Sequence, residues 1–245
     1  MQEQTLNIET TDGKMETFIT HPDGKGPFPV VVLYMDAPGI REELYDFARR
    51  VGTVGYYCIV PDLYYRLGRK RYDLSQVTDE MREEYLGCMR TLSNGMIVED
   101  TRAVLHFLEG QSAARPGIKG CMGYCMSGQF VMSVAGTFPE QFRATASYHG
   151  VGHITDQPDS PHLLANKLQG EFYFGFAEED PYVPLEQVEQ LRGIMEASPA
   201  KTTIDVHPGT LHGYSFPQRP VFVKEAAERN WERTFAMFHR QIPAI

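Results

Sequence analysis

Short apolar runs alternate with amphipathic stretches along nearly the whole chain. The run FPVVVLYM (28–35) is continuously apolar, as expected for a strand buried on both faces of a sheet. Two β-prone segments, 6–10 and 15–21, flank the turn residues Asp12-Gly13 and predict an N-terminal hairpin. Further strands are predicted at 56–60, 117–123, 144–150, 171–177 and 201–207.

Segments with helical spacing of apolar residues lie between these strands. They predict helices over 40–53, 76–110 with a break near Ser93-Asn94-Gly95, 127–138, 184–197 and 219–240. Strands that alternate with helices imply an α/β fold, with a mostly parallel central sheet of about seven to eight strands and helices on both faces. Because no linker, repeat or low-complexity stretch divides the chain, we expect a single domain over residues 1–245.

Charge and cysteine content narrow the possible partners. The formal net charge of −9 disfavours a nucleic acid or an anionic membrane, since both attract clustered Lys and Arg. No signal-peptide pattern or long apolar run is present, so a cytoplasmic location is expected. The four cysteines do not suggest a disulfide framework, and the Cys121/Cys125 pair lacks a second Cys/His pair, so neither a metal nor a cofactor is expected. The sequence gives no indication of the oligomeric state.

The segment Gly123-Tyr124-Cys125-Met126-Ser127-Gly128 lies directly between a predicted strand and a predicted helix. Small residues two positions before and after Cys125 match the nucleophile elbow, a turn too tight for larger side chains there. The thiol would then lie at a helix N-terminus, which favours a thiolate. Ser127 is a weaker rival, because Gln129 stands where its own turn needs a small residue.

An acid and a histidine follow in the order that the α/β-hydrolase fold requires. Asp180 comes after the strand 171–177 and is the preferred acid; Glu178 and Glu179 are the alternatives. His212 lies between turn residues, after the last predicted strand and before the last helix. Such an acid can orient the imidazole and stabilise its charged form.

The remaining candidates are the oxyanion donors, a partner for the thiol and the aromatic lining of a pocket; the loop after the strand 28–35 supplies Ala37 and Asp36. The N–H groups of Met126 and Ala37 are the expected oxyanion donors, because Pro38 has no N–H to give. Asp36 would lie near the thiol, where it could hydrogen-bond the thiol or serve only as a turn residue. Among the aromatic residues at strand ends, Tyr64 and Tyr124 are candidates for an apolar substrate pocket, with packing in the core as the alternative.

Three motifs together resemble the dienelactone hydrolase family: G-Y-C-M-S-G, E-D-P-Y-V-P and L-H-G-Y-S-F, with V-P-D-L-Y-Y-R at 60–66. The likeness extends from about Thr5 to Phe238. It implies an α/β-hydrolase fold, a Cys125–His212–Asp180 triad and a small-molecule ester or lactone as substrate. Asp36 stands where the founding type of the family carries a glutamate that interacts with the cysteine.

The resemblance also implies a substrate-binding set. Lactone-cleaving members hold a substrate carboxylate with two arginines. Here Arg82 lies near the first of these positions, while Phe216 occupies the second and Arg219 follows three residues later. The altered second position changes the expected carboxylate site.

These residues predict a hydrolase that opens an ester or lactone through a thioester on Cys125. A broad carboxylesterase or thioesterase that uses the same triad is one alternative. A non-catalytic binding protein on a hydrolase scaffold is another, because a fold does not fix a function.

Overall fold

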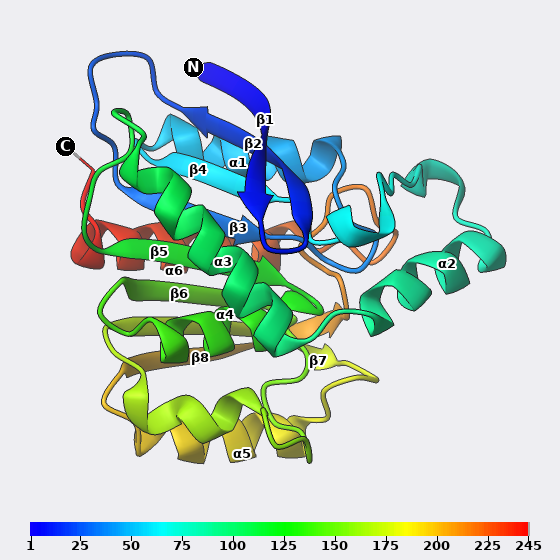
Figure 1. Ribbon diagram of the computed structural model, residues 1–245. Helices are drawn as coiled ribbons and strands as arrows, with labels where there is room; N and C mark the ends of the chain where they lie inside the picture. The colour runs from blue at the N-terminus through cyan, green and yellow to red at the C-terminus, as the bar shows by residue number, and fades with distance from the viewer. Residues whose placement is uncertain (245) are drawn as a thin grey trace.

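The computed structural model, which describes residues 1–244, contains an eight-stranded sheet in the order β1-β2-β4-β3-β5-β6-β7-β8 (Figure 1). The strands β1 and β2 are antiparallel to their neighbours, whereas β3 to β8 are mutually parallel. The predicted mostly parallel sheet is therefore confirmed. The strand bounds are β1 Gln2–Thr10, β2 Gly13–His21, β3 Val30–Tyr34, β4 Tyr57–Pro61, β5 Lys119–Tyr124, β6 Phe142–Tyr148, β7 Glu171–Glu179 and β8 Lys201–Leu211.

Helices cover both faces of this sheet, with α3 and α4 on one face and α1 and α6 on the other (Figure 1). Among residues 1–244, no helix combines the length and the apolar character that crossing a bilayer requires. The helix bounds are α1 Glu42–Thr53, α2 Asp79–Arg90, α3 Asn94–Glu109, α4 Ser127–Thr137, α5 Leu185–Glu196 and α6 Lys224–Gln241, with short 3₁₀ helices η1 Tyr65–Leu67, η2 Leu74–Gln76 and η3 Pro161–Lys167.

The register of the parallel strands brings their carboxyl ends to one edge. Tyr34 at the end of β3 lies opposite Gly123 of β5, and Tyr124 lies opposite Tyr148 at the end of β6. The loops that carry Asp36, Cys125 and the residues after β7 and β8 therefore emerge side by side. In such sheets this edge is where ligands bind.

The predicted break in the stretch 76–110 is confirmed: it separates α2 from α3, and Ser93 caps α3 by accepting a hydrogen bond from the N–H of Met96. The first helix of this stretch begins at Asp79 rather than at 76. The last helix begins at Lys224 rather than at 219, after a run of turns that includes Pro217 and Pro220. The helix α2 extends away from the sheet, beyond the carboxyl ends of the parallel strands (Figure 1).

Candidate active site

Cys125 occupies the sharp turn between β5 and α4. Its φ of 53° lies in the left-handed region, which non-glycine residues seldom adopt. Hydrogen bonds hold this conformation: the N–H of Cys125 donates to the Tyr148 carbonyl at 3.1 Å, and the N–H of Val151 donates to the Cys125 carbonyl at 2.9 Å. A Cβ at Gly123 would lie 2.9 Å from the Ser127 Cβ, so the turn requires the small residues of the sequence motif.

The structure brings the three candidate catalytic side chains into one chain of hydrogen bonds. The Nε2 atom of His212 lies 3.2 Å from the Sγ atom of Cys125. The Nδ1 atom of His212 lies 2.7 Å from an Asp180 carboxylate oxygen. The Asp180 side chain is only 1% exposed and that of His212 11%, so the contacts are largely shielded from water. This shielding strengthens their electrostatic interaction.

Two neighbouring histidines differ in their protonation. Burial disfavours the charged form of His212, but hydrogen bonds with Asp180 and Cys125 outweigh it and raise its pKa to about 9. The ring of His149 packs edge-on against that of His212, with 4.9 Å between ring centroids. Burial and the nearby His212 lower the pKa of His149 well below its ordinary value. His212 is therefore the imidazole that can hold a proton here.

Two backbone N–H groups near the thiol have no protein acceptor among residues 1–244. They belong to Met126, which precedes the first residue of α4, and to Ala37, which follows β3. The Tyr64 hydroxyl donates to the Ala37 carbonyl at 2.7 Å and holds this loop in place. Unpaired N–H groups at a helix N-terminus favour negative charge, so the arrangement suits an oxyanion.

The expected contact between Asp36 and the thiol is not observed. Among the described residues, the partners of the Asp36 side chain are two guanidinium groups, those of Arg41 at 2.5 Å and of Arg219. The Asp36 side chain is fully buried, and a buried carboxylate needs such cationic partners. Asp36 therefore belongs to an ion-pair cluster beside the active site.

A pocket of about 500 Å³ opens in front of Cys125 and His212. Its wall is mostly apolar and comes largely from α2 and from the loops after β3, β7 and β8. Both predicted arginines, Arg82 and Arg219, line it. The further lining residues are Ala37, Pro38, Leu74, Val77, Tyr85, Leu86, Met89, Val151, Glu179, Pro181, Tyr182, Leu211, Gln218 and Pro220.

Three predicted substrate-binding residues are absent from this lining. Tyr64, Tyr124 and Phe216 are at most 2% exposed, so the assignment of these side chains to the pocket is wrong. Tyr64 and Tyr124 pack in the core, the alternative that their positions left open. The ring of Phe216 packs against two guanidinium groups, with its centroid 4.7 Å from that of Arg41 and 4.4 Å from that of Arg219.

The rival nucleophiles lie in other surroundings. The Ser127 hydroxyl is buried and donates to the Met35 carbonyl. Cys121 is fully buried in β5, and burial raises the pKa of its thiol to about 12. Within residues 1–244, no group of three or more His, Cys, Asp or Glu side chains is arranged to hold a metal ion. Cys125 is therefore the thiol that faces both an imidazole and the pocket.

Several site residues escaped the sequence analysis. Arg41 is one, although the charged run Arg41-Glu42-Glu43 so soon after Asp36 was an available signal. Tyr182 is another: its ring packs edge-on against His212, with 4.8 Å between centroids. It lies inside the E-D-P-Y-V-P motif. The apolar residues of α2 could not be identified, because an amphipathic helix does not reveal what its apolar face covers.

The sequence matches a family model described as "Dienelactone hydrolase family" over residues 15–242. The chain belongs to this family, and it is a hydrolase of the α/β-hydrolase fold. The resemblance inferred from the three motifs is thus confirmed.

Individual relatives agree with this assignment. Proteins named "Putative carboxymethylenebutenolidase" from Synechocystis sp. and Escherichia coli are 25% and 28% identical to the chain. These alignments cover 97% and 95% of the chain and 99% and 84% of the relatives. A crystal structure described as "Putative Dienelactone Hydrolase" from Klebsiella pneumoniae superimposes with a TM-score of 0.85 at 22% identity, covering 98% of each chain. At that identity the structural likeness supports the fold alone.

Proposed function

We propose that the chain hydrolyses a small ester or lactone through a Cys125–His212–Asp180 triad and a thioester intermediate. The observation that carries this proposal is the continuous set of contacts from the Cys125 sulfur through both nitrogens of His212 to Asp180. A nucleophile, a base and a carboxylate that orients the base are the parts that nucleophilic catalysis requires. The ordered triad also argues against a non-catalytic binding protein.

In the first half of the reaction, the Cys125 thiol transfers its proton to His212, and the thiolate attacks the substrate carbonyl carbon. The N–H groups of Met126 and Ala37 donate to the oxyanion that forms. The tetrahedral intermediate then collapses to a thioester, and the C–O bond to the leaving group breaks. His212, now protonated, gives its proton to the departing alkoxide or enolate.

In the second half, His212 removes a proton from a water molecule, which attacks the thioester carbonyl. The carboxylic acid is released and Cys125 recovers its proton. A thiolate leaves a tetrahedral intermediate more easily than a poor leaving group does. The mechanism therefore favours activated esters, enol lactones and thioesters over amides.

The pocket suggests a mostly apolar substrate with one anionic group. Arg82 lines it, and none of the carboxylates of residues 1–244 forms a salt bridge with this side chain, whereas Arg219 is paired with Asp36. We assign Arg82 to a substrate carboxylate and Arg219 to the wall of the pocket. The relatives' name denotes an enzyme acting on a butenolide, which is an unsaturated lactone, and this chemistry fits the same arrangement.

Turnover of p-nitrophenyl acetate tests the triad. The Cys125→Ala variant should lose activity by at least about a thousandfold, since the nucleophile is gone. The matched variant Cys121→Ala removes a buried thiol and should keep most of the activity. Iodoacetamide should modify Cys125 far faster than Cys58, Cys88 or Cys121. A folded protein that shows no turnover of any activated ester would favour the binding-protein alternative.

A panel of lactones and esters, each with and without a carboxylate, tests the substrate. Arg82→Gln should raise KM for the carboxylate-bearing members and leave kcat/KM for the neutral members unchanged. Equal effects on both groups would favour the broad carboxylesterase.

The expected cytoplasmic location remains a prediction.

A further inference from the structure

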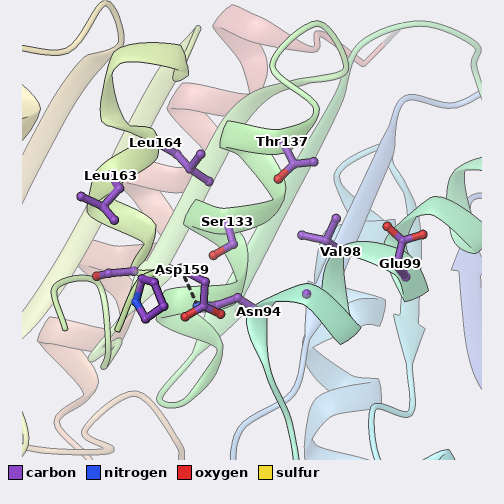
Figure 2. Close-up of a pocket in the computed structure, with 11 residues that line it drawn as sticks. Asn94, Val98, Glu99, Ser133, Thr137, Asp159, Leu163 and Leu164 are labelled. Carbon is purple, nitrogen blue, oxygen red and sulfur yellow. Dashed lines mark hydrogen bonds between the residues drawn. The ribbon is translucent and has the colours of Figure 1, made fainter. Parts of the chain in front are cut away.

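A second hollow of about 500 Å³ lies between α3, α4 and the segment that leads into η3 (Figure 2). It shares no lining residue with the pocket at Cys125. Its wall is mainly apolar, with Val98 on α3 facing Leu163 and Leu164 of η3. The remaining lining residues are Asn94, Gly95, Glu99, Ser133, Thr137, Pro158, Asp159 and Ser160.

Two buried side chains that line this hollow have a polar oxygen without a hydrogen-bond partner among the described residues. These oxygens are the Oδ1 atom of Asn94 and the Oγ atom of Ser133. Asn94 is 8% exposed and Ser133 3%. The two side chains project from α3 and α4 into the same space (Figure 2). A buried polar group left unpaired destabilises the fold, so each oxygen calls for a partner.

The orientation of the Asn94 amide is set by its other end. Its Nδ2 atom donates to the Asp159 carbonyl at 3.1 Å, which leaves the acceptor Oδ1 without a partner and almost without accessible surface at the edge of the hollow. An amide oxygen can only accept a hydrogen bond, while the Ser133 hydroxyl can donate or accept. A molecule that pairs with Asn94 must therefore bring an O–H or N–H group.

The charges of the residues that line the hollow disfavour an anionic ligand. Its ionisable residues are Glu99 and Asp159, both acidic and both exposed, and it contains no Lys, Arg or His. Arg102 pairs with Glu99 on the outer surface, at 3.1 Å. A carboxylate in the hollow would meet these acids and an acceptor oxygen without a cationic partner. The lining thus disfavours anions.

We propose that this hollow is a second ligand site, which binds a small apolar molecule with one O–H or N–H donor and no negative charge. A small adjustment of the Asn94 and Ser133 side chains lets the donor pair with Asn94 Oδ1 beside the Ser133 hydroxyl. The apolar body packs against Val98, Leu163 and Leu164. An aromatic alcohol and an aromatic amine share this chemistry. The site does not depend on the reaction at Cys125.

Methyl NMR of the full chain tests the proposal, with the Cys125→Ala variant used to prevent turnover. Benzyl alcohol and aniline should shift the methyl signals of Val98, Leu163 and Leu164 in a saturable manner. Toluene should bind more weakly, because it has no donor, and benzoate more weakly still. Shifts confined to Leu74, Val77 and Leu86 would place the probes in the catalytic pocket and overturn the proposal.

Ser133→Ala removes the hydroxyl and should weaken the binding of benzyl alcohol roughly three- to tenfold without destabilising the fold. Thr145→Val, which removes a buried hydroxyl elsewhere, should leave the affinity unchanged. Val98→Phe changes a half-buried residue, fills the hollow and should abolish the shifts. Equal binding of all four probes, no effect of Ser133→Ala, or only an ordered water at Ser133 in a crystal soaked with benzyl alcohol would overturn the second site.

Discussion

Two buried carboxylates at the same edge of the sheet have different partners. Asp36 follows β3 and Asp180 follows β7, and their side chains are 0% and 1% exposed. Asp180 contacts the imidazole of His212, a group that can gain or lose a proton near neutral pH. Asp36 contacts the guanidinium groups of Arg41 and Arg219, which remain charged.

This difference separates a carboxylate that can assist proton transfer from one that can only hold the structure together. The cluster of Asp36, Arg41 and Arg219 nevertheless borders the active site through two segments of the chain. It joins the loop of Ala37 to the segment after His212, because Arg219 packs against Gly213, where a Cβ would lie 2.5 Å from its guanidinium. The comparison therefore predicts a loss of catalysis at one carboxylate and a loss of stability at the other.

The largest expected effect belongs to Asp180→Asn. The amide cannot stabilise a protonated His212, so kcat for an activated ester should fall by about 10³- to 10⁴-fold. The control is Glu178→Gln, which changes the neighbouring acid and should cost less than tenfold. Steady-state turnover, measured under conditions where circular dichroism shows the variant to be folded, checks the prediction. Comparable losses in both variants would contradict the assignment of Asp180.

The next effect belongs to Asp36→Asn, which removes the carboxylate shared by the buried Arg41 and the half-buried Arg219 and leaves Arg41 paired with Glu43 alone. The free energy of unfolding should fall by about 3–5 kcal/mol, as measured by urea denaturation with Trp231 fluorescence. The exposed Glu42 also binds an arginine, Arg49, and Glu42→Gln should cost less than about 1 kcal/mol. If Asp36→Asn kept wild-type stability but lost turnover as Asp180→Asn is expected to, the roles assigned to the two carboxylates would have to be exchanged.

The raised pKa of His212 predicts a pH dependence of stability. The pKa is about 9 in the folded chain and 6.5 in an unperturbed histidine. The folded state therefore binds the proton more tightly, so this stabilisation is complete below pH 6.5 and is lost as the pH rises through about 9. Urea unfolding across this range should show the decline. Asp180→Asn should make the decline shallower, and an unchanged slope would contradict the ion pair.

The smallest effect concerns the ring of Phe216, which packs against two guanidinium groups. Phe216→Leu should cost about 0.5–2 kcal/mol more than Phe142→Leu, because Phe142 is equally buried but forms no cation–π contact among the described residues. Urea denaturation of both variants gives the difference. Equal costs would show that the ring contributes only its apolar surface.

Local motifs made the fold and the sharp turn at Cys125 predictable. The elbow depends on residues within two positions of Cys125, and β3, which is buried throughout, reads directly as an apolar run. We still infer a single domain for residues 1–245, because strands from both ends of the chain join one sheet. Half of the Asp36 cluster had a local signal, because Arg41 lies five residues from Asp36, but Arg219 is 183 residues away and nothing in the local pattern indicates that pairing.

The substrate-binding residues were harder still to predict. Tyr64 and Tyr124 stand at strand ends in the sequence, but whether such a ring faces a pocket or the core depends on neighbours from other strands. Tyr124 packs against Phe47 of α1 and Tyr148 of β6. These contacts are tertiary, and an aromatic residue at a strand end is compatible with either position.

The helix α2 supplies Arg82, Tyr85, Leu86 and Met89 to the catalytic pocket while it extends away from the sheet. Cys125, Met126 and Ala37, the nucleophile and oxyanion donors of the proposed mechanism, belong instead to turns that follow central strands. Substitutions on α2 can therefore reshape the pocket without moving these turns, so the choice of substrate and the proposed bond-breaking chemistry can be altered separately.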